Sequence, residues 1–220
     1  MILRPVGFGK VGSCLVNFFM SDKFKIAVFS SGNGSNFESI VTSKIPNVEV
    51  SLMLCNMPNA YVLERAKKLS VETIIVSHKD FGSRKDFEKE IISKLEKYNL
   101  DLIVLAGFKR ILSPFFTAHY DKKVINLHPS LLPAFTGLHA PKQALEYGTK
   151  FSGCTVHFVD DGIDTGPIIA QGLVTVEDSD TEESLTEKIH QKEHEVLPFA
   201  IRLLSEDKVS VEGRRVLIKN

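Results

Sequence analysis

The sequence predicts an α/β protein. We expect a Rossmann-like, open, twisted and mostly parallel sheet with helices on both faces, a long C-terminal helix and a terminal hairpin. Short apolar runs alternate with amphipathic segments from about residue 25 onward, at the spacing of βαβ units. The length of 220 residues suits one large α/β domain, and 43% apolar residues can fill its core.

Four buried strands are expected in the first half of the chain, each an apolar run bounded by turn residues. They span residues 25–29, 48–55, 72–77 and 101–107. Between them, apolar residues three and four apart indicate amphipathic helices. These helices are expected over residues 36–43, 60–70 and 83–99. Strands joined by such crossover helices pair in parallel.

The pattern continues in the second half of the chain and then changes. A fifth strand is expected at 123–128 and a helix at 139–148. Two further strands, 152–159 and 166–176, precede a long helix over 181–206, and Gly213 separates two apolar runs that predict a hairpin at 208–218. Since there is no internal repeat or linker, residues 24–220 are predicted to form one domain.

Residues 1–23 do not fit this pattern and are expected to be a poorly ordered leader or the result of a start site assigned too early, with Met20 as the true start. Lys10 and three glycines interrupt the apolar stretch, which argues against a signal peptide. The stretch GFGKVG (7–12) matches G-x-G-x-x-G, but that pattern should follow a buried strand, so we disfavour dinucleotide binding.

Composition excludes several functional classes. Lys plus Arg and Asp plus Glu both number 27, so net charge gives no reason to expect nucleic acid or an anionic membrane as a partner. No apolar run approaches the roughly 18 residues of a membrane span. Cys14, Cys55 and Cys154 are odd in number and widely spaced, which disfavours disulfides and zinc and predicts a cytoplasmic protein.

The stretch SGNGSN (31–36) joins the first strand to the first helix. Its glycines permit close approach of an anion, and the N–H groups and dipole of a helix N-terminus favour negative charge. We predict binding of a single phosphate. No Lys-Ser/Thr follows, so this is not a Walker loop. The alternative is an ordinary βα turn, which also favours Gly, Ser and Asn.

The stretch VINLHP (124–129) ends the fifth strand. Residues two apart on a strand share a face, about 6.5–7 Å apart, so Asn126 and His128 lie together where open parallel sheets bind ligands. Pro129 prevents further ladder pairing. Two converging donors suit a developing oxyanion. The alternative is an Asn that caps a turn beside a hydrogen-bonded His.

The stretch DDGIDTGP (160–167) carries three Asp residues. A calcium loop that started at Asp160 would need Glu at its twelfth position, where Gln171 stands. An Asp that reached His128 would favour the protonated imidazole and make it a usable general acid. The alternative is a solvated loop.

Two weaker patterns involve histidines outside these stretches. His190 and His194 are four apart on a helix, but Gln191 replaces the Glu of H-E-x-x-H, so a solvated helix face is favoured over a metal site. His157 alternates within an apolar strand and is expected in the core or as a support for other site residues.

Several long stretches occur together in one order. They are SGNGSN, LAGFKRILS, NLHPSLLPAF, GLHAPKQAL, GCTVHFV, DDGIDTGPIIAQ and KEHEVLP. Through them the chain resembles the folate-dependent formyltransferases, particularly those that act on glycinamide ribonucleotide. The resemblance runs from about residue 25 to the terminal hairpin. Lys109 differs from it, because Met is common at that position.

The resemblance implies roles for individual residues. The catalytic residues would be Asn126, His128 and Asp164. The ribonucleotide would be held by Gly34, Ser35, Asn36, His190 and Glu193. The folate would be enclosed by Arg84, Lys109, Arg110, Ile111, Leu112, Asn126, Asp160, Asp161, Gly162 and Ile163. No metal is implied.

The implied reaction transfers the formyl group of 10-formyltetrahydrofolate to the amine of 5-phosphoribosylglycinamide, in purine synthesis. The expected partners are these small molecules, and the chain would be a monomer or a homodimer. Three alternatives remain: formyltetrahydrofolate hydrolase, methionyl-tRNA formyltransferase and a non-catalytic nucleotide-binding module. The first two resemble this chain but usually carry additional domains, and the third would need only the Gly-rich turn.

Overall fold

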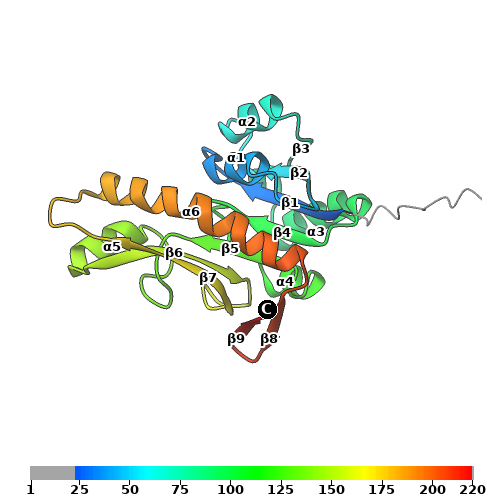
Figure 1. The fold of residues 1–220 in the computed structure, drawn as a ribbon. Helices are drawn as coiled ribbons and strands as arrows, with labels where there is room; N and C mark the ends of the chain where they lie inside the picture. The colour runs from blue at the N-terminus through cyan, green and yellow to red at the C-terminus, as the bar shows by residue number, and fades with distance from the viewer. Residues whose placement is uncertain (1–22, 220) are drawn as a thin grey trace, which may run out of the picture.

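The structure is a computed structural model that describes residues 23–219 (Figure 1). The predictions for the leader, for GFGKVG and for Cys14 therefore lie outside the described residues. Within them, the main feature is a seven-stranded sheet with strand order β3-β2-β1-β4-β5-β6-β7. A two-stranded antiparallel sheet, β8-β9, forms the predicted terminal hairpin.

The strands lie where the apolar runs predicted them. Their bounds are β1 Phe24–Ser30, β2 Val48–Cys55, β3 Thr73–Ile75, β4 Leu102–Leu105, β5 Val124–His128, β6 Phe151–Phe158, β7 Ile168–Thr175, β8 Val209–Glu212 and β9 Arg215–Ile218. Strands β1 to β5 pair in parallel, whereas β6 and β7 are antiparallel. The chain between β5 and β6 begins and ends at the carboxyl edge, so β6 returns beside β5. The predicted mostly parallel sheet is confirmed.

Six α-helices cover this sheet in the described part of the chain. They are α1 Ser35–Thr42, α2 Val62–Lys68, α3 Arg84–Leu95, α4 Pro114–His119, α5 Ala140–Tyr147 and α6 Glu182–Ser205. Helix α4 was not predicted. Helix α3 ends before the predicted residue 99, because a 3₁₀ turn, η2 Glu96–Tyr98, and left-handed Asn99 (φ 49°) follow Leu95. Another 3₁₀ turn, η1 His78–Asp80, precedes α3. No helix within residues 23–219 has the length and hydropathy to cross a bilayer.

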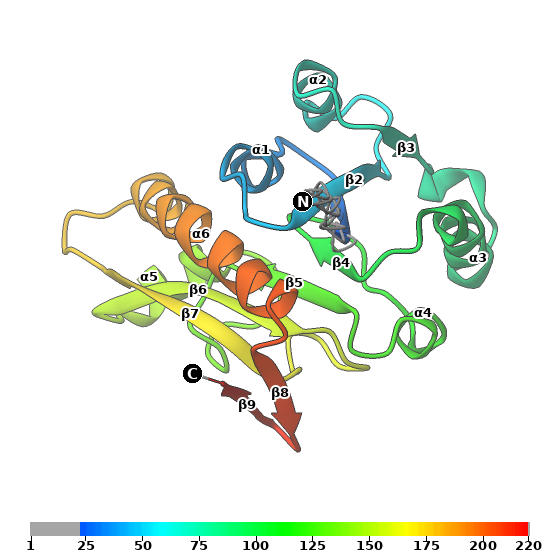
Figure 2. The same ribbon diagram turned by 45° about the vertical axis from the view of Figure 1, so that its right-hand side comes forward.

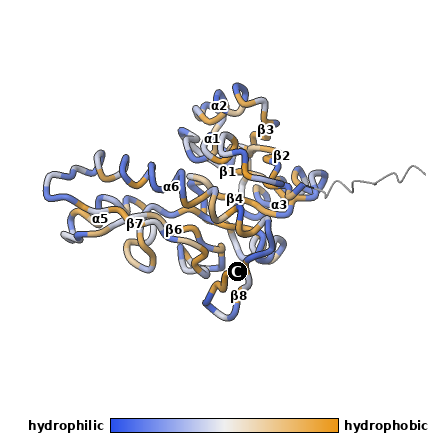
Figure 3. The backbone as a smooth tube through the Cα atoms, in the orientation of Figure 1, coloured by the Kyte–Doolittle hydropathy of each residue, from blue (hydrophilic) through white to orange (hydrophobic). Residues whose placement is uncertain are grey.

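The core has two parts, one on each face of the sheet. One part joins alternate strand residues to α1 and α6 through Phe37, Ile40 and Ile189. The other joins the remaining strand residues to α3 and α4 through Phe87 and Phe116. Figure 2 shows these two helix pairs on opposite sides of the strands, and Figure 3 shows the hydrophobic segments along the strands between them.

Helix α6 is fixed to its neighbours at several points. Thr181 and Ser184 form a capping box at its start. Pro198 lies inside the helix and has no N–H, which leaves the carbonyl of His194 without its helical donor. The hydroxyl of Ser39 on α1 donates to that carbonyl at 3.2 Å. The proline thereby ties α6 to α1.

Strand register aligns three chain segments at the carboxyl edge of the sheet. Phe29 of β1 pairs with Leu105 of β4, and Leu105 pairs with Asn126 of β5. The segments that follow these residues therefore leave the sheet at one edge. Strand order reverses between β1 and β4, and such a switch point is where open α/β sheets bind ligands.

Candidate active site

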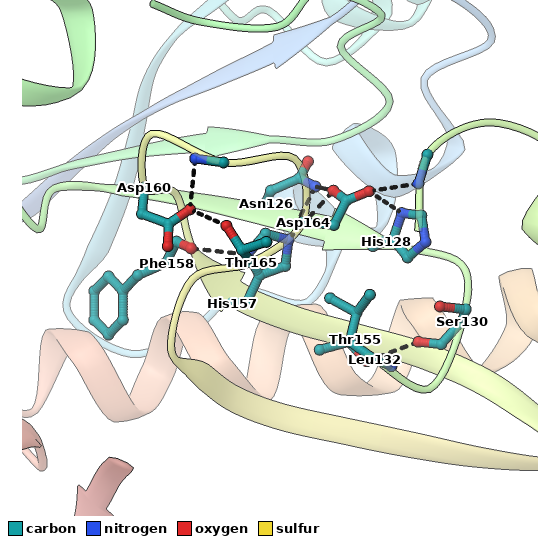
Figure 4. A network of polar contacts seen from close by, with 12 residues as sticks. Asn126, His128, Ser130, Leu132, Thr155, His157, Phe158, Asp160, Asp164 and Thr165 are labelled. Carbon is teal, nitrogen blue, oxygen red and sulfur yellow. Dashed lines mark hydrogen bonds and ion pairs between the residues drawn. The ribbon is translucent and has the colours of Figure 1, made fainter. Parts of the chain in front are cut away.

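The structure brings Asn126, His128 and Asp164 into contact. Asn126 and His128 share one face of β5, because Leu127 between them packs into the α1–α6 part of the core. Asp164 comes from the loop after β6. Its Oδ2 lies 3.3 Å from His128 Nδ1, and its Oδ1 accepts from Asn126 Nδ2 at 3.3 Å (Figure 4). Of the three Asp residues in this loop, Asp164 is therefore the one whose carboxylate lies against His128.

Asp164 is held in one orientation by the backbone. Its φ of 55° is left-handed, and its Oδ2 accepts from Gly137 N–H at 2.8 Å. Burial alone would raise the pKa of this carboxyl, but the adjacent His157 ring, the hydrogen bond from Gly137 and the charge of His128 hold the pKa below its ordinary value of 3.8. His157 Nε2 is 3.7 Å away, beyond hydrogen-bond distance, so of these two residues only Gly137 makes a hydrogen bond to the carboxylate.

Both ring nitrogens of His128 face acceptors. Nδ1 faces the Asp164 carboxylate, and Nε2 lies 2.8 Å from the carbonyl oxygen of Phe135. A carbonyl only accepts, so Nε2 carries a hydrogen. His128 is 4% exposed, and a protonated ring satisfies both partners. The arrangement suits a general acid.

His157 lies directly opposite Asn126 in the β5–β6 pair. Its Nδ1 is 2.7 Å from the Phe158 carbonyl and therefore donates. In the neutral ring Nε2 then accepts from Asn126 Nδ2, which is 3.2 Å away. The expected supporting place of His157 is confirmed, but its contact with Asn126 depends on β6 pairing antiparallel with β5, which the sequence pattern did not reveal.

Asn126 directs its NH₂ group at both His157 and Asp164. An incoming ligand oxygen must therefore take the place of one of these acceptors, as it must replace the Phe135 carbonyl at His128. Catalytic hydrogen bonds often adopt their final geometry only when the substrate is bound. Asn126, His128 and Asp164, here called the trio, are thus already joined by contacts among themselves.

A buried hydroxyl supports the turn after β5. Thr155 faces His128 across the β5–β6 pair and is fully buried. Its Oγ1 donates to Ser130 O at 2.7 Å and accepts from Leu132 N–H at 3.1 Å (Figure 4). It also accepts from Gln171 Nε2 at 3.0 Å. The turn that leads to Phe135 is thereby fixed to β6.

The predicted ribonucleotide residues also come together. Gly34 is the N-cap of α1 with φ 81° and makes no side-chain cap, so it leaves the first-turn N–H groups of α1, including Ser35, available to an anion. Asn36 Nδ2 donates to Glu193 Oε2 at 2.8 Å, although 157 residues separate them. Burial raises the pKa of Glu193, opposed by the Asn36 hydrogen bond and the charge of His190.

The predicted folate residues of α3 and of the β4–α4 segment have different environments. Arg84 is exposed at the start of α3, and Lys109 and Arg110 are also exposed. Ile111 is 54% exposed, whereas Leu112 is 6% exposed and belongs to the core, so only its backbone can face a ligand.

The buried carboxylate of Glu88 holds the end of that segment. It accepts from Ser113 N–H at 2.7 Å and from the Ser113 hydroxyl. Glu88 is fully buried, and no local sequence pattern indicated this role.

The loop 160–163 is shaped by its own side chains. Asp160 Oδ1 accepts from Gly162 N–H at 3.1 Å and from Thr165 Oγ1 at 2.6 Å. Asp161 accepts from Thr117 of α4 at 3.0 Å, and Ile163 is 52% exposed. The loop is therefore tied to α4, on the same face as the other predicted folate residues.

The remaining histidine pair, His190 and His194, lies on α6. Within residues 23–219, no three His, Cys, Asp or Glu side chains cluster as metal ligands would. Burial lowers the pKa of His194, and its Nε2 is buried without a partner among those residues. The prediction that His194 lies on a solvated helix face is therefore wrong for its Nε2 atom, which is buried.

The chain matches the family model described as formyl transferase over residues 24–201. It is 44% identical to a phosphoribosylglycinamide formyltransferase of Bacillus subtilis, over 82% of this chain and 94% of that one. It is 43% identical to the trifunctional purine biosynthetic protein adenosine-3 of Drosophila melanogaster, of whose length the matched region spans 14%.

Solved structures agree with the sequence relatives. A glycinamide ribonucleotide transformylase from Symbiobacterium toebii superposes with a TM-score of 0.89 at 40% identity, over 92% of this chain and 97% of that chain. A phosphoribosylglycinamide formyltransferase from Coxiella burnetii has a TM-score of 0.85 at 36% identity, over 89% and 93% of the two chains. Sequence and fold thus agree that the chain belongs to the formyl transferase family.

Proposed function

We propose that this protein transfers the formyl group of 10-formyltetrahydrofolate to the amine of 5-phosphoribosylglycinamide, giving the N-formyl product and tetrahydrofolate in purine synthesis. The observation that carries the proposal is the contact of Asp164 with both His128 and Asn126 at the carboxyl edge of the sheet. The relatives of B. subtilis and S. toebii are named for this activity.

Two groups of residues are assigned to bind the two ligands, the ribonucleotide and the folate. Those assigned to the ribonucleotide belong to α1 and α6, whose side chains share one part of the core. Those assigned to the folate belong to α3, the segment before α4 and the loop tied to α4, on the other face. The two groups meet at the carboxyl edge, where the trio lies. This arrangement brings an amine and a formyl donor together.

The trio matches the charge that formyl transfer develops. The neutral amine nitrogen attacks the formyl carbon, a C–N bond forms, and negative charge grows on the formyl oxygen. Asn126 and protonated His128 donate to that oxygen in place of their present acceptors. A positioned donor of this kind contributes on the order of 10²–10³ in rate. The Asp164 carboxylate stabilises the charged imidazole.

Completion of the transfer requires one proton movement. The attacking nitrogen loses a proton, and N10 of the folate gains one as its bond to the formyl carbon breaks. His128 and a bound water carry this proton in our proposal. We place the reaction in the cytoplasm, as the dispersed cysteines predict; Cys55 and Cys154 are free thiols.

A turnover assay tests the proposal. The purified chain is mixed with 10-formyltetrahydrofolate and 5-phosphoribosylglycinamide, and both products are quantified. Tetrahydrofolate and the formylated ribonucleotide are expected in equal amounts. Tetrahydrofolate and formate without the ribonucleotide would identify a hydrolase. Turnover with initiator methionyl-tRNA in its place would identify that alternative, and no tetrahydrofolate with any acceptor would reject catalysis.

A further inference from the structure

The Gly-rich turn, Ser31 to Asn36, is contacted by Arg65 of helix α2. Arg65 of α2 donates from Nε to Asn33 O at 3.0 Å and from Nη2 to Asn33 Oδ1 at 3.0 Å. Its Nη1 pairs with Glu38 in the first turn of α1. The guanidinium also lies 5.1 Å from the ring centroid of Tyr61. The fork of Arg65 thus engages the turn at two oxygens and α1 at a third.

These contacts determine the directions in which the donors and acceptors of the turn point. The Asn33–Gly34 peptide is trans, so its carbonyl and the N–H of Gly34 point to opposite sides. The carbonyl of Gly32 also faces α2, where it accepts from Val62 N–H at 3.0 Å. The carbonyls of Gly32 and Asn33 are therefore directed at α2, and the Gly34 N–H is directed away from it.

Close packing keeps the turn in this orientation. A Cβ at Gly34 would lie 2.4 Å from a Val62 methyl group, so α2 contacts the turn directly. The turn itself, Ser31 to Asn36, contains no Lys or Arg. Arg65 brings a cation next to it and also offsets the carboxylate of Glu38, which would otherwise oppose an anion at the start of α1.

We propose that Arg65 is a positioning residue for the phosphate of the acceptor: it fixes the peptide between Asn33 and Gly34 so that the turn presents its N–H groups, and it supplies the cation that the turn lacks. The proposal rests on the proposed function. The side chain is 20% exposed and Glu38 is 41% exposed, and partly exposed ion pairs add little to stability. Its main effect is therefore expected on phosphate affinity.

The test compares Arg65→Met and Arg65→Lys with Lys68→Met, which removes one exposed cation from the same helix. KM and kcat are measured with 5-phosphoribosylglycinamide and with the corresponding riboside, which lacks phosphate. Arg65→Met should raise KM for the ribonucleotide about tenfold or more, with the riboside and folate constants within about twofold. Arg65→Lys should recover only part, because one ammonium cannot form the fork. Equal loss with both acceptors, or no difference from Lys68→Met, would overturn the proposal.

A double variant separates positioning from charge. If Arg65 only neutralises Glu38, then Arg65→Met combined with Glu38→Gln should restore wild-type KM, and this result would overturn the positioning role. A KM that remains raised supports it. If the wild-type chain has no turnover with this substrate pair, the proposed function fails, and calorimetric titration with ribose 5-phosphate replaces kinetics. Weaker binding in Arg65→Met than in Lys68→Met then supports the proposal, and equal binding overturns it.

Discussion

His128 donates from Nε2 to the carbonyl oxygen of Phe135 at 2.8 Å, on the opposite side of the ring from Asp164. The proton that we assign to catalysis is therefore directed at a backbone oxygen from the turn after β5. A formyl oxygen that replaces the carbonyl would accept the same hydrogen bond. Phe135 has a positive φ of 55°, which orients its carbonyl within this turn.

Replacement of His128 by Ala should abolish turnover and leave ribonucleotide binding intact. The ring supplies the proton and one oxyanion donor, whereas the ribonucleotide contacts are expected on α1 and α6. Steady-state kcat and equilibrium titration with the ribonucleotide measure the two effects. A variant that keeps more than about a tenth of wild-type kcat would reject the role of His128.

Asp164→Asn should change the pH dependence of the reaction. The carboxylate lies 3.3 Å from His128 Nδ1, and Asn removes its charge while keeping its size. The acid limb of the pH–rate profile should therefore shift. The profile is measured for kcat/KM across the acid range with folate saturating. An acid limb that coincides with the wild-type limb would argue against coupling between these residues.

The same substitution should alter stability in a pH-dependent way. The folded-state pKa of Asp164 is below 3.8, so its ionised form stabilises the fold at pH values above 3.8. That contribution is lost as pH falls through the folded-state pKa. Urea unfolding at a series of pH values should show that wild type and Asp164→Asn differ most near neutrality and converge in acid. A constant difference would contradict the assignment.

Glu193→Gln should show the opposite pH dependence. Burial raises the folded-state pKa of Glu193 above 4.5, so the protonated acid stabilises the fold at low pH, and this contribution is lost as pH rises through the folded-state pKa. Gln keeps an oxygen acceptor for Asn36 and does not ionise. The variant should gain stability relative to wild type as pH rises, while ribonucleotide affinity falls roughly tenfold. Unfolding curves and titration at matched pH test both.

Thr155→Val should destabilise the fold without changing side-chain volume much. The lost hydroxyl leaves Ser130 O and Leu132 N–H buried without their partner, which costs about 1–3 kcal/mol. The free energy of unfolding in urea measures the loss. Thr175→Val on the exposed face of β7 is the control and should change stability by less than about 0.5 kcal/mol.

Local periodicity accounts for the parts of the site that the sequence predicts. Asn126 and His128 share a face because strand residues alternate, and the end of β5 follows from Pro129. The first turn of α1 follows from the glycines before it. The family resemblance, rather than periodicity, selected Asp164 from the three Asp residues of its loop.

Contacts between distant elements account for what sequence analysis missed. His157 meets Asn126 only because β6 runs antiparallel beside β5, and Arg65 meets Asn33 only because α2 packs against the turn after β1. Neither relation leaves a periodic signal in one segment. Helix α4 is different, since Ser113 and Pro114 are recognisable start signals that its short apolar stretch did not reinforce.

The division of the core between the two faces of the sheet has an evolutionary consequence. If the acceptor binds as we propose, residues on α1, α2 and α6 can change without repacking α3 and α4, because the strands lie between the two sets. A lineage could thus keep one formyl donor while recruiting a succession of amines. Under the proposed function, the seven-stranded sheet separates the residues proposed for the acceptor from those proposed for the donor.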